Sequence, residues 1–258
     1  MYSREINNDE KEKINTIIDS ILTEIPTIDP NDPEREIKIF TYIYTRLSGS
    51  IIYDDEAAGI LDQLHKLGGF NRERFEDTHP IDPRIYDARA ILCGKALCSG
   101  FADILQIALE RTGIKSIKIH GISADGKHVW NQVCLDGQWY NCDLTNDYEF
   151  VLEGMECNYF LKSDAEFPNN NKYKIDTERT PEVHKCNISV SSKHQEELLN
   201  NSKTIVLQVS PKQKEEKNII QNNSMPIKNK FASFIDSILE FIKSGLRKMK
   251  ESTNEYEK

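Results

Sequence analysis

Apolar residues recur every three or four positions in the first part of this chain, which is the spacing of amphipathic helices. Helices are predicted at residues 9–25, 33–47 and 56–67, with a short one near 85–92. Prolines at positions 26, 30 and 33 separate the first two helices. Residues 101–109 are apolar on nearly every side, as a buried helix is, and Gly113 supplies its stop.

Alternating apolar and polar residues follow this helix and predict strands at 116–122, 127–135 and 138–145, with 158–162 as a candidate fourth. Asp136-Gly137 is a strong signal for a two-residue hairpin turn. If Leu135 pairs with Gln138, then Trp130 pairs with Asp143. His128 and Asp143 then lie diagonally on one face of the hairpin, within reach of long side chains. His120 alternates with a lysine in the first strand and is predicted to face solvent.

Cys98 lies just before the buried helix, where free backbone N–H groups and the positive end of the helix dipole converge. That position favours the thiolate, which is the nucleophilic form of cysteine. A nucleophilic thiol needs a base, and the base needs a group that orients it. Cys98, His128 and Asp143 supply these three groups in that order. The alternative is that Cys98 is a small core residue, as most single cysteines are.

Composition narrows the functional class. The chain has 258 residues, a net charge of −9 and six cysteines. The negative charge gives no electrostatic case for nucleic-acid binding. The cysteines lack the spacing of zinc ligands, so we interpret them as reduced thiols and expect a cytoplasmic protein. No signal peptide or membrane-spanning segment is predicted, although a protein exported without a cleaved signal would look the same.

Several short motifs carry a family resemblance. They are residues 94–102 (GKALCSGFA), Gly121, residues 128–131 (HVWN) and residues 136–145 (DGQWYNCDLT), with flanking matches at 52–54 (IYD) and 159–164 (YFLKSD). Together they resemble the transglutaminase-like superfamily, and most closely its bacterial branch. The resemblance covers roughly residues 32–164. Asn146 stands where many relatives have a tryptophan, from which we expect an altered substrate cleft, while Asp147 is kept.

The resemblance implies an α+β fold with a papain-like core, in which helices pack against an antiparallel sheet, and a catalytic Cys98, His128 and Asp143. It implies thiol chemistry on protein amides through a thioester. This chemistry requires no cofactor and no metal. Glutamine transamidation, deamidation and peptide hydrolysis all remain open. Trp130 and Trp139 are expected to wall the cleft or simply to pack in the core, and Tyr53 is a candidate oxyanion donor. The competing hypothesis is a non-enzymatic binding or scaffold protein.

We predict four segments: an N-terminal helix and proline-rich link (1–30), a catalytic core (31–187), a polar linker (188–230), and a C-terminal helix and tail (231–258). Within the linker, residues 205–209 could form an edge strand. The stretch from Phe231 to Met249 has a wide apolar stripe and a basic end. It either folds back on the core or binds a protein partner or an anionic membrane surface. We expect a chain ending near Cys186 to fold.

Overall fold

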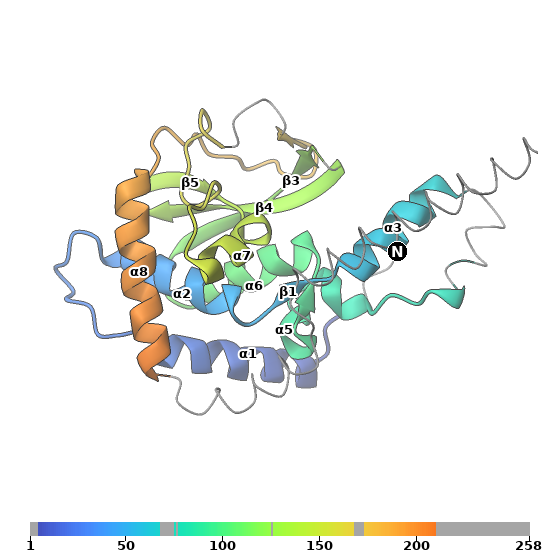
Figure 1. The fold of residues 1–258 in the computed structure, drawn as a ribbon, viewed down its shortest axis with the longest axis horizontal. Helices are drawn as coiled ribbons and strands as arrows, with labels where there is room; N and C mark the ends of the chain where they lie inside the picture. Colours follow the sequence, from blue (N-terminus) through green and yellow to red (C-terminus); the bar gives the residue numbers. More distant parts are fainter. Residues whose placement is uncertain (1–4, 68–74, 76, 125, 168–172, 210–258) are drawn as a thin grey trace, which may run out of the picture. The chain divides into compact units, whose positions relative to one another are not determined.

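The computed structural model describes residues 5–67, 75, 77–124, 126–167 and 173–209 (Figure 1). The chain divides into two units at residues 207 and 208. The predicted C-terminal helix and tail, with the predicted linker from residue 210 onward, lie outside the described residues. The boundaries of the four segments therefore stay predictions.

The first three helices and the central buried helix agree with the spacing of apolar residues, whereas the last two helices were not predicted. The described helices are α1 (Asn8–Thr23), α2 (Arg35–Ser48), α3 (Asp55–Lys66), the 3-10 helix η1 (Pro83–Tyr86), α5 (Ala90–Cys93), α6 (Cys98–Glu110), α7 (Leu144–Glu153) and α8 (Ser192–Val209). Local chemistry sets their ends. Asn7 caps α1, because its Oδ1 accepts from Glu10 N at 2.9 Å and Glu10 Oε2 accepts in return from Asn7 N at 3.0 Å. Gly154 ends α7 in the left-handed conformation, with φ of 78°.

The strands form two sheets. The larger has four antiparallel strands in the order β5 (Gln138–Cys142), β4 (Gly126–Leu135), β3 (Lys115–Ser123) and β6 (Lys174–Ile175). The smaller pairs β1 (Ile52–Tyr53) with β2 (Lys95–Ala96) in parallel. The predicted pairing of Leu135 with Gln138 is confirmed. Asp136 and Gly137 both have positive φ, 49° and 79°, as this hairpin turn requires.

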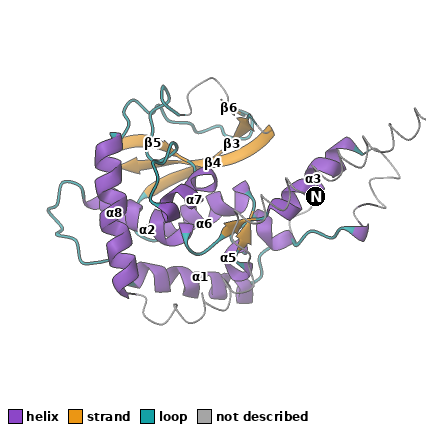
Figure 2. Ribbon diagram, in the orientation of Figure 1, coloured by secondary structure: helices purple, strands orange, loops and turns teal. Residues whose placement is uncertain are grey.

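The helices and the larger sheet form successive layers. Helix α6 packs on β3 and β4, and α2 and α7 pack on α6 (Figures 1 and 2). The core between them holds Phe40, Tyr44, Phe101, Leu105 and Phe160, each fully buried. The predicted class, helices against an antiparallel sheet, is confirmed. Cys98 begins the central helix and His128 lies on the central hairpin, so the two come from opposite layers.

Three details differ from the predicted elements. The strand predicted at 138–145 ends at Cys142, because Asp143 caps α7 and the chain turns into that helix. The fourth strand of the sheet is β6, whereas residues 158–162 contribute only an isolated bridge between Asn141 and Lys162. Residues 192–209 form α8 where a linker and an edge strand were predicted, since Leu198 and Leu199 are buried in the core.

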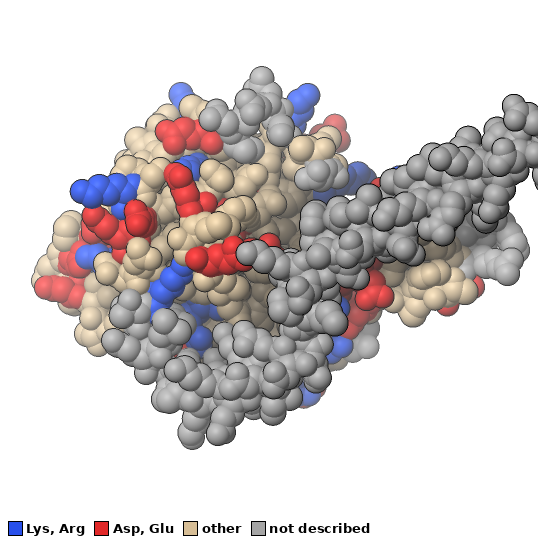
Figure 3. Space-filling view, in the orientation of Figure 1, with Lys and Arg blue, Asp and Glu red and all other residues tan. Residues whose placement is uncertain are grey.

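No helix among the described residues is long and apolar enough to cross a membrane. On the face drawn in Figure 3, acidic and basic side chains of the described residues are interspersed. The mixture of charges on this face is expected from the composition, since the chain has 33 basic and 42 acidic residues.

Candidate active site

Cys98 is the first residue of α6, and backbone contacts with η1 fix its position. The Leu97 N–H donates to Ile85 O at 2.9 Å, and the Ser99 hydroxyl donates to Tyr86 O at 2.6 Å. A Cβ on Gly100 would lie 2.5 Å from Ile85 O, so only glycine allows this close approach. Cys98, which is half-buried, therefore lies at the N-terminus of α6, where the backbone N–H groups have no partner within the helix.

His128 lies on β4, and its Nε2 is 2.6 Å from Oδ2 of Asp143. Only 10% of its side chain is exposed, and the Asp143 side chain is fully buried. Burial by itself lowers the pKa of His128. The charge of Asp143, the hydrogen bond to it and a hydrogen bond with Cys98 outweigh burial and raise that pKa to about 10. Because Asp143 occupies Nε2, Nδ1 is the ring nitrogen left for Cys98.

Asp143 lies between β5 and α7 and serves both as a helix cap and as a partner for His128. Its Oδ1 accepts from the N–H groups of Thr145 at 3.1 Å and Asn146 at 3.4 Å. Its Oδ2 accepts from the Asn146 amide at 2.7 Å and from the Tyr173 hydroxyl at 2.9 Å. The capping bonds explain why the strand stops here and hold the carboxylate toward β4.

A cavity of about 490 Å³ opens at Cys98 and His128. Its lining includes Tyr53 of β1, Asp55 at the start of α3, Glu149 on α7 and Lys127 of β4. The cavity wall beside Cys98 and His128 therefore carries charges of both signs. The Tyr148 hydroxyl donates to Glu149 Oε1 at 2.9 Å.

Residues 55–144 match the sequence profile of the transglutaminase-like superfamily. The chain contains a transglutaminase-like domain. The matched span includes Cys98, His128 and Asp143 and stops before Asn146. A solved structure, "Crystal structure of a TGase", is 19% identical, with a TM-score of 0.38. The alignment covers 55% of this chain and only 34% of the TGase chain. None of the curated protein sequences matches this chain.

The fold brings together four of the six residues that the sequence proposed for the site. Cys98, His128 and Tyr53 line the cavity, and Asp143 lies behind His128. Trp130 is 2% exposed and packs behind the site among aromatic rings, 6.2 Å from the His128 ring. Trp139 lies elsewhere, with its indole stacked at 3.7 Å on His184, and it does not line this cavity.

Two residues of the site were missed by sequence reasoning as partners of Asp143. Asn146 had a local signal, because the third residue after a helix cap faces the capping side chain. Tyr173 lies 30 residues beyond Asp143, and nothing in the local sequence indicates the contact. His120, predicted to face solvent, is instead half-buried, and burial lowers its pKa.

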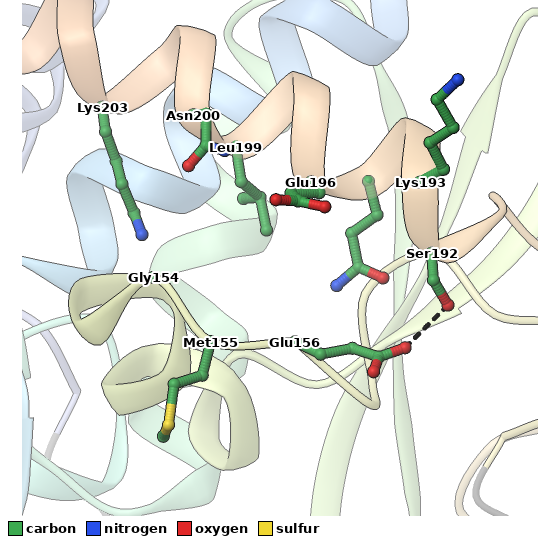
Figure 4. Close-up of a pocket in the computed structure, with 10 residues that line it drawn as sticks. Gly154, Met155, Glu156, Ser192, Lys193, Glu196, Leu199, Asn200 and Lys203 are labelled. Carbon is green, nitrogen blue, oxygen red and sulfur yellow. Dashed lines mark hydrogen bonds between the residues drawn. The ribbon is translucent and has the colours of Figure 1, made fainter.

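A second hollow, about 400 Å³, lies between α8 and residues 154–156 (Figure 4). Lys203 extends toward Gly154, and the Ser192 hydroxyl donates to Glu156 at 2.7 Å (Figure 4). None of the site residues that the sequence predicted lines this hollow.

Proposed function

We propose that this protein is a thiol enzyme that acts on protein amides through a thioester on Cys98. The observation that carries this proposal is a single arrangement. Cys98 and His128 line one cavity, and a fully buried Asp143 lies 2.6 Å behind the imidazole. His128 with a raised pKa is an imidazolium at neutral pH, and it stabilises the thiolate beside it.

In the first half-reaction, the Cys98 thiolate attacks the carbonyl carbon of a glutamine carboxamide or a peptide bond. The backbone N–H of Cys98, at the start of α6, donates to the developing oxyanion in this proposal. The C–N bond breaks, and His128 gives its proton to the departing ammonia or amine. Cys98 is then a thioester, and His128 is neutral.

In the second half-reaction, water or a lysine amine attacks the thioester. Neutral His128 takes the proton of the attacking group, and the C–S bond breaks to restore the thiolate. Asp143 holds the imidazole in the tautomer and orientation that both half-reactions require. Attack by water gives deamidation or proteolysis, and attack by an amine gives a cross-link.

Intact mass spectrometry of candidate protein substrates, after incubation with this protein, tests the proposal and separates the reactions. A gain of about 1 Da indicates deamidation, a loss of about 17 Da on joining an amine indicates transfer, and fragments indicate proteolysis. The Cys98→Ser variant must abolish the change, whereas Cys93→Ser, outside the cavity, must leave it intact.

Limiting iodoacetamide near neutral pH provides a test that needs no substrate. We expect Cys98 to be alkylated before the other five cysteines, because the helix N-terminus and His128 favour its thiolate. Peptide mapping measures the order of labelling. Preferential labelling of Cys93 or Cys134 would contradict the assignment.

A further inference from the structure

Three donors converge on one buried oxygen beside the proposed base. Oδ2 of Asp143 lies 2.6 Å from His128 Nε2, 2.7 Å from Asn146 Nδ2 and 2.9 Å from the Tyr173 hydroxyl. The Asn146 amide nitrogen also lies 2.6 Å from the Tyr173 hydroxyl. Asn146, Tyr173 and the carboxylate thus form a closed triangle of hydrogen bonds.

We propose that Asn146 and Tyr173 are positioning residues that hold Asp143 against His128. This inference rests on the proposed function of Cys98 and His128. Both residues lie outside the span that matches the superfamily profile, which ends at residue 144. Asn146 also stands where many members of the family that this sequence resembles have a tryptophan, which cannot make the same pair of hydrogen bonds.

The donor count fixes the roles in the triangle. An amide nitrogen has two N–H bonds, and Asn146 directs one to Asp143 and the other to the Tyr173 oxygen. A tyrosine has one O–H bond, and Tyr173 directs it to Asp143. All three groups that face Oδ2 can donate, so this oxygen accepts from each of them. Burial and the charge of Asp143 raise the pKa of Tyr173 well above its usual range, which keeps the hydroxyl a donor.

Tyr173 also contacts the imidazole itself. Its ring meets the His128 ring edge to face, with centroids 5.5 Å apart and planes at 86°. It packs in the same way on Trp130, with centroids 5.1 Å apart. Tyr173 directly precedes β6, which pairs with β3 at Gly121, the residue opposite His128. One side chain therefore limits both the rotation of Asp143 and the tilt of His128.

The test compares three variants that each remove one polar group. Tyr173→Phe removes only a hydroxyl, Asn146→Leu removes the amide at similar size, and Tyr42→Phe removes a buried hydroxyl on α2, away from the cavity. The first readout is the rate of Cys98 alkylation by iodoacetamide across pH. The second is the proton NMR signal of the His128 Nε2–H, which a strong hydrogen bond to a carboxylate moves downfield.

We expect Tyr173→Phe and Asn146→Leu each to slow alkylation at neutral pH by about tenfold, to shift its pH profile upward, and to move the His128 signal upfield. The double variant is expected to add little, because the triangle acts as a unit. Tyr42→Phe is expected to change neither readout. Folded Tyr173→Phe and Asn146→Leu variants with wild-type profiles and signals would overturn the inference, as would equal effects of Tyr42→Phe.

The proposed function and this inference fail in different ways. If Cys98 of the wild-type protein reacts no faster than Cys93, the proposed function fails. The NMR signal of His128 would still report whether Tyr173 and Asn146 hold Asp143. If Cys98 reacts selectively but neither substitution affects the signal or the profile, only the positioning role is lost.

Discussion

Trp130 occupies the space that any side chain at Gly121 would need. A Cβ at position 121 would lie 2.6 Å from Cη2 of Trp130 and 2.3 Å from the backbone oxygen of Lys174. Gly121 is also the cross-strand partner of His128. The glycine therefore lets β6 and the indole pack closely beside the proposed base.

Gly121→Ala is expected to lower the free energy of unfolding by about 1–3 kcal/mol, because the new methyl group overpacks a buried site. It should also slow Cys98 alkylation, since Trp130 must move beside His128. Gly59→Ala, with nothing within 4 Å of the added carbon, is the matched control. It is expected to stabilise α3 by about 0.5–1 kcal/mol. Urea denaturation of both variants measures the difference, and equal effects would contradict the packing argument.

Asp143→Asn is expected to lower the rate of the proposed reaction at least about tenfold while the fold is retained. The amide keeps the shape but removes the charge that holds His128 as an imidazolium. Asp164→Asn is the matched control, because Asp164 accepts from the Asn141 amide at 2.9 Å and from Cys186 N at 3.1 Å, away from the cavity. Turnover near that of the wild type in Asp143→Asn would remove Asp143 from the site.

The free energy of unfolding should fall in alkaline solution, because His128 loses its proton there. Its pKa rises from 6.5 in the reference state to about 10 in the folded protein, so folding favours its protonated form. That contribution is complete below about pH 6.5 and is lost as the pH rises toward about 10, by up to about 1.4 kcal/mol per pH unit. Urea denaturation from about pH 6.5 to about pH 9.5 should show that the free energy of unfolding falls more steeply with pH in the wild type than in His128→Gln. Parallel curves would show that His128 is not held as an imidazolium.

Charge around the cavity should select among thiol reagents. Asp55 and Glu149 line the cavity together with Lys127. We expect Glu149→Gln to lower, by about threefold, the ratio of Cys98 modification by aminoethyl methanethiosulfonate to that by its anionic sulfonatoethyl analogue. Lys127→Gln should raise the ratio. Glu153→Gln, on the same helix but not lining the cavity, is the control. An unchanged ratio in Glu149→Gln would show that this charge does not act at Cys98.

The position of α8 revises the expected effect of truncation. Leu198 and Leu199 are 6% and 4% exposed, and the Gln195 amide donates to Cys157 O at 2.8 Å. Burying each leucine contributes about 1.5–3 kcal/mol, so a chain ending at Cys186 should melt at a much lower temperature than one ending at Val209. Thermal denaturation of the two chains decides the point. Equal melting temperatures would restore the expectation that the chain folds without α8.

The local sequence determined several helices, the hairpin and the position of Cys98 next to the buried helix. Apolar spacing defined α1, α2, α3 and α6 to within a few residues, and Asp136-Gly137 fixed the hairpin register, because each depends only on neighbouring residues. That register placed His128 and Asp143 on one face before any tertiary contact was known. The motifs that resemble the transglutaminase-like superfamily also contain Cys98, His128 and Asp143. The apolar run begins at Phe101, whereas α6 begins three residues earlier, at Cys98 itself.

Tertiary structure decided what surrounds these groups. Tyr173 reaches Asp143 from 30 residues away, and α8 became a helix because its leucines find a buried surface. Trp130 and Trp139 looked equivalent in sequence, yet one packs behind His128 and the other stacks on His184. Periodicity defines which face of an element is apolar. Which distant side chain covers that face, and which donors close around a buried carboxylate, depends on contacts that only the folded chain makes.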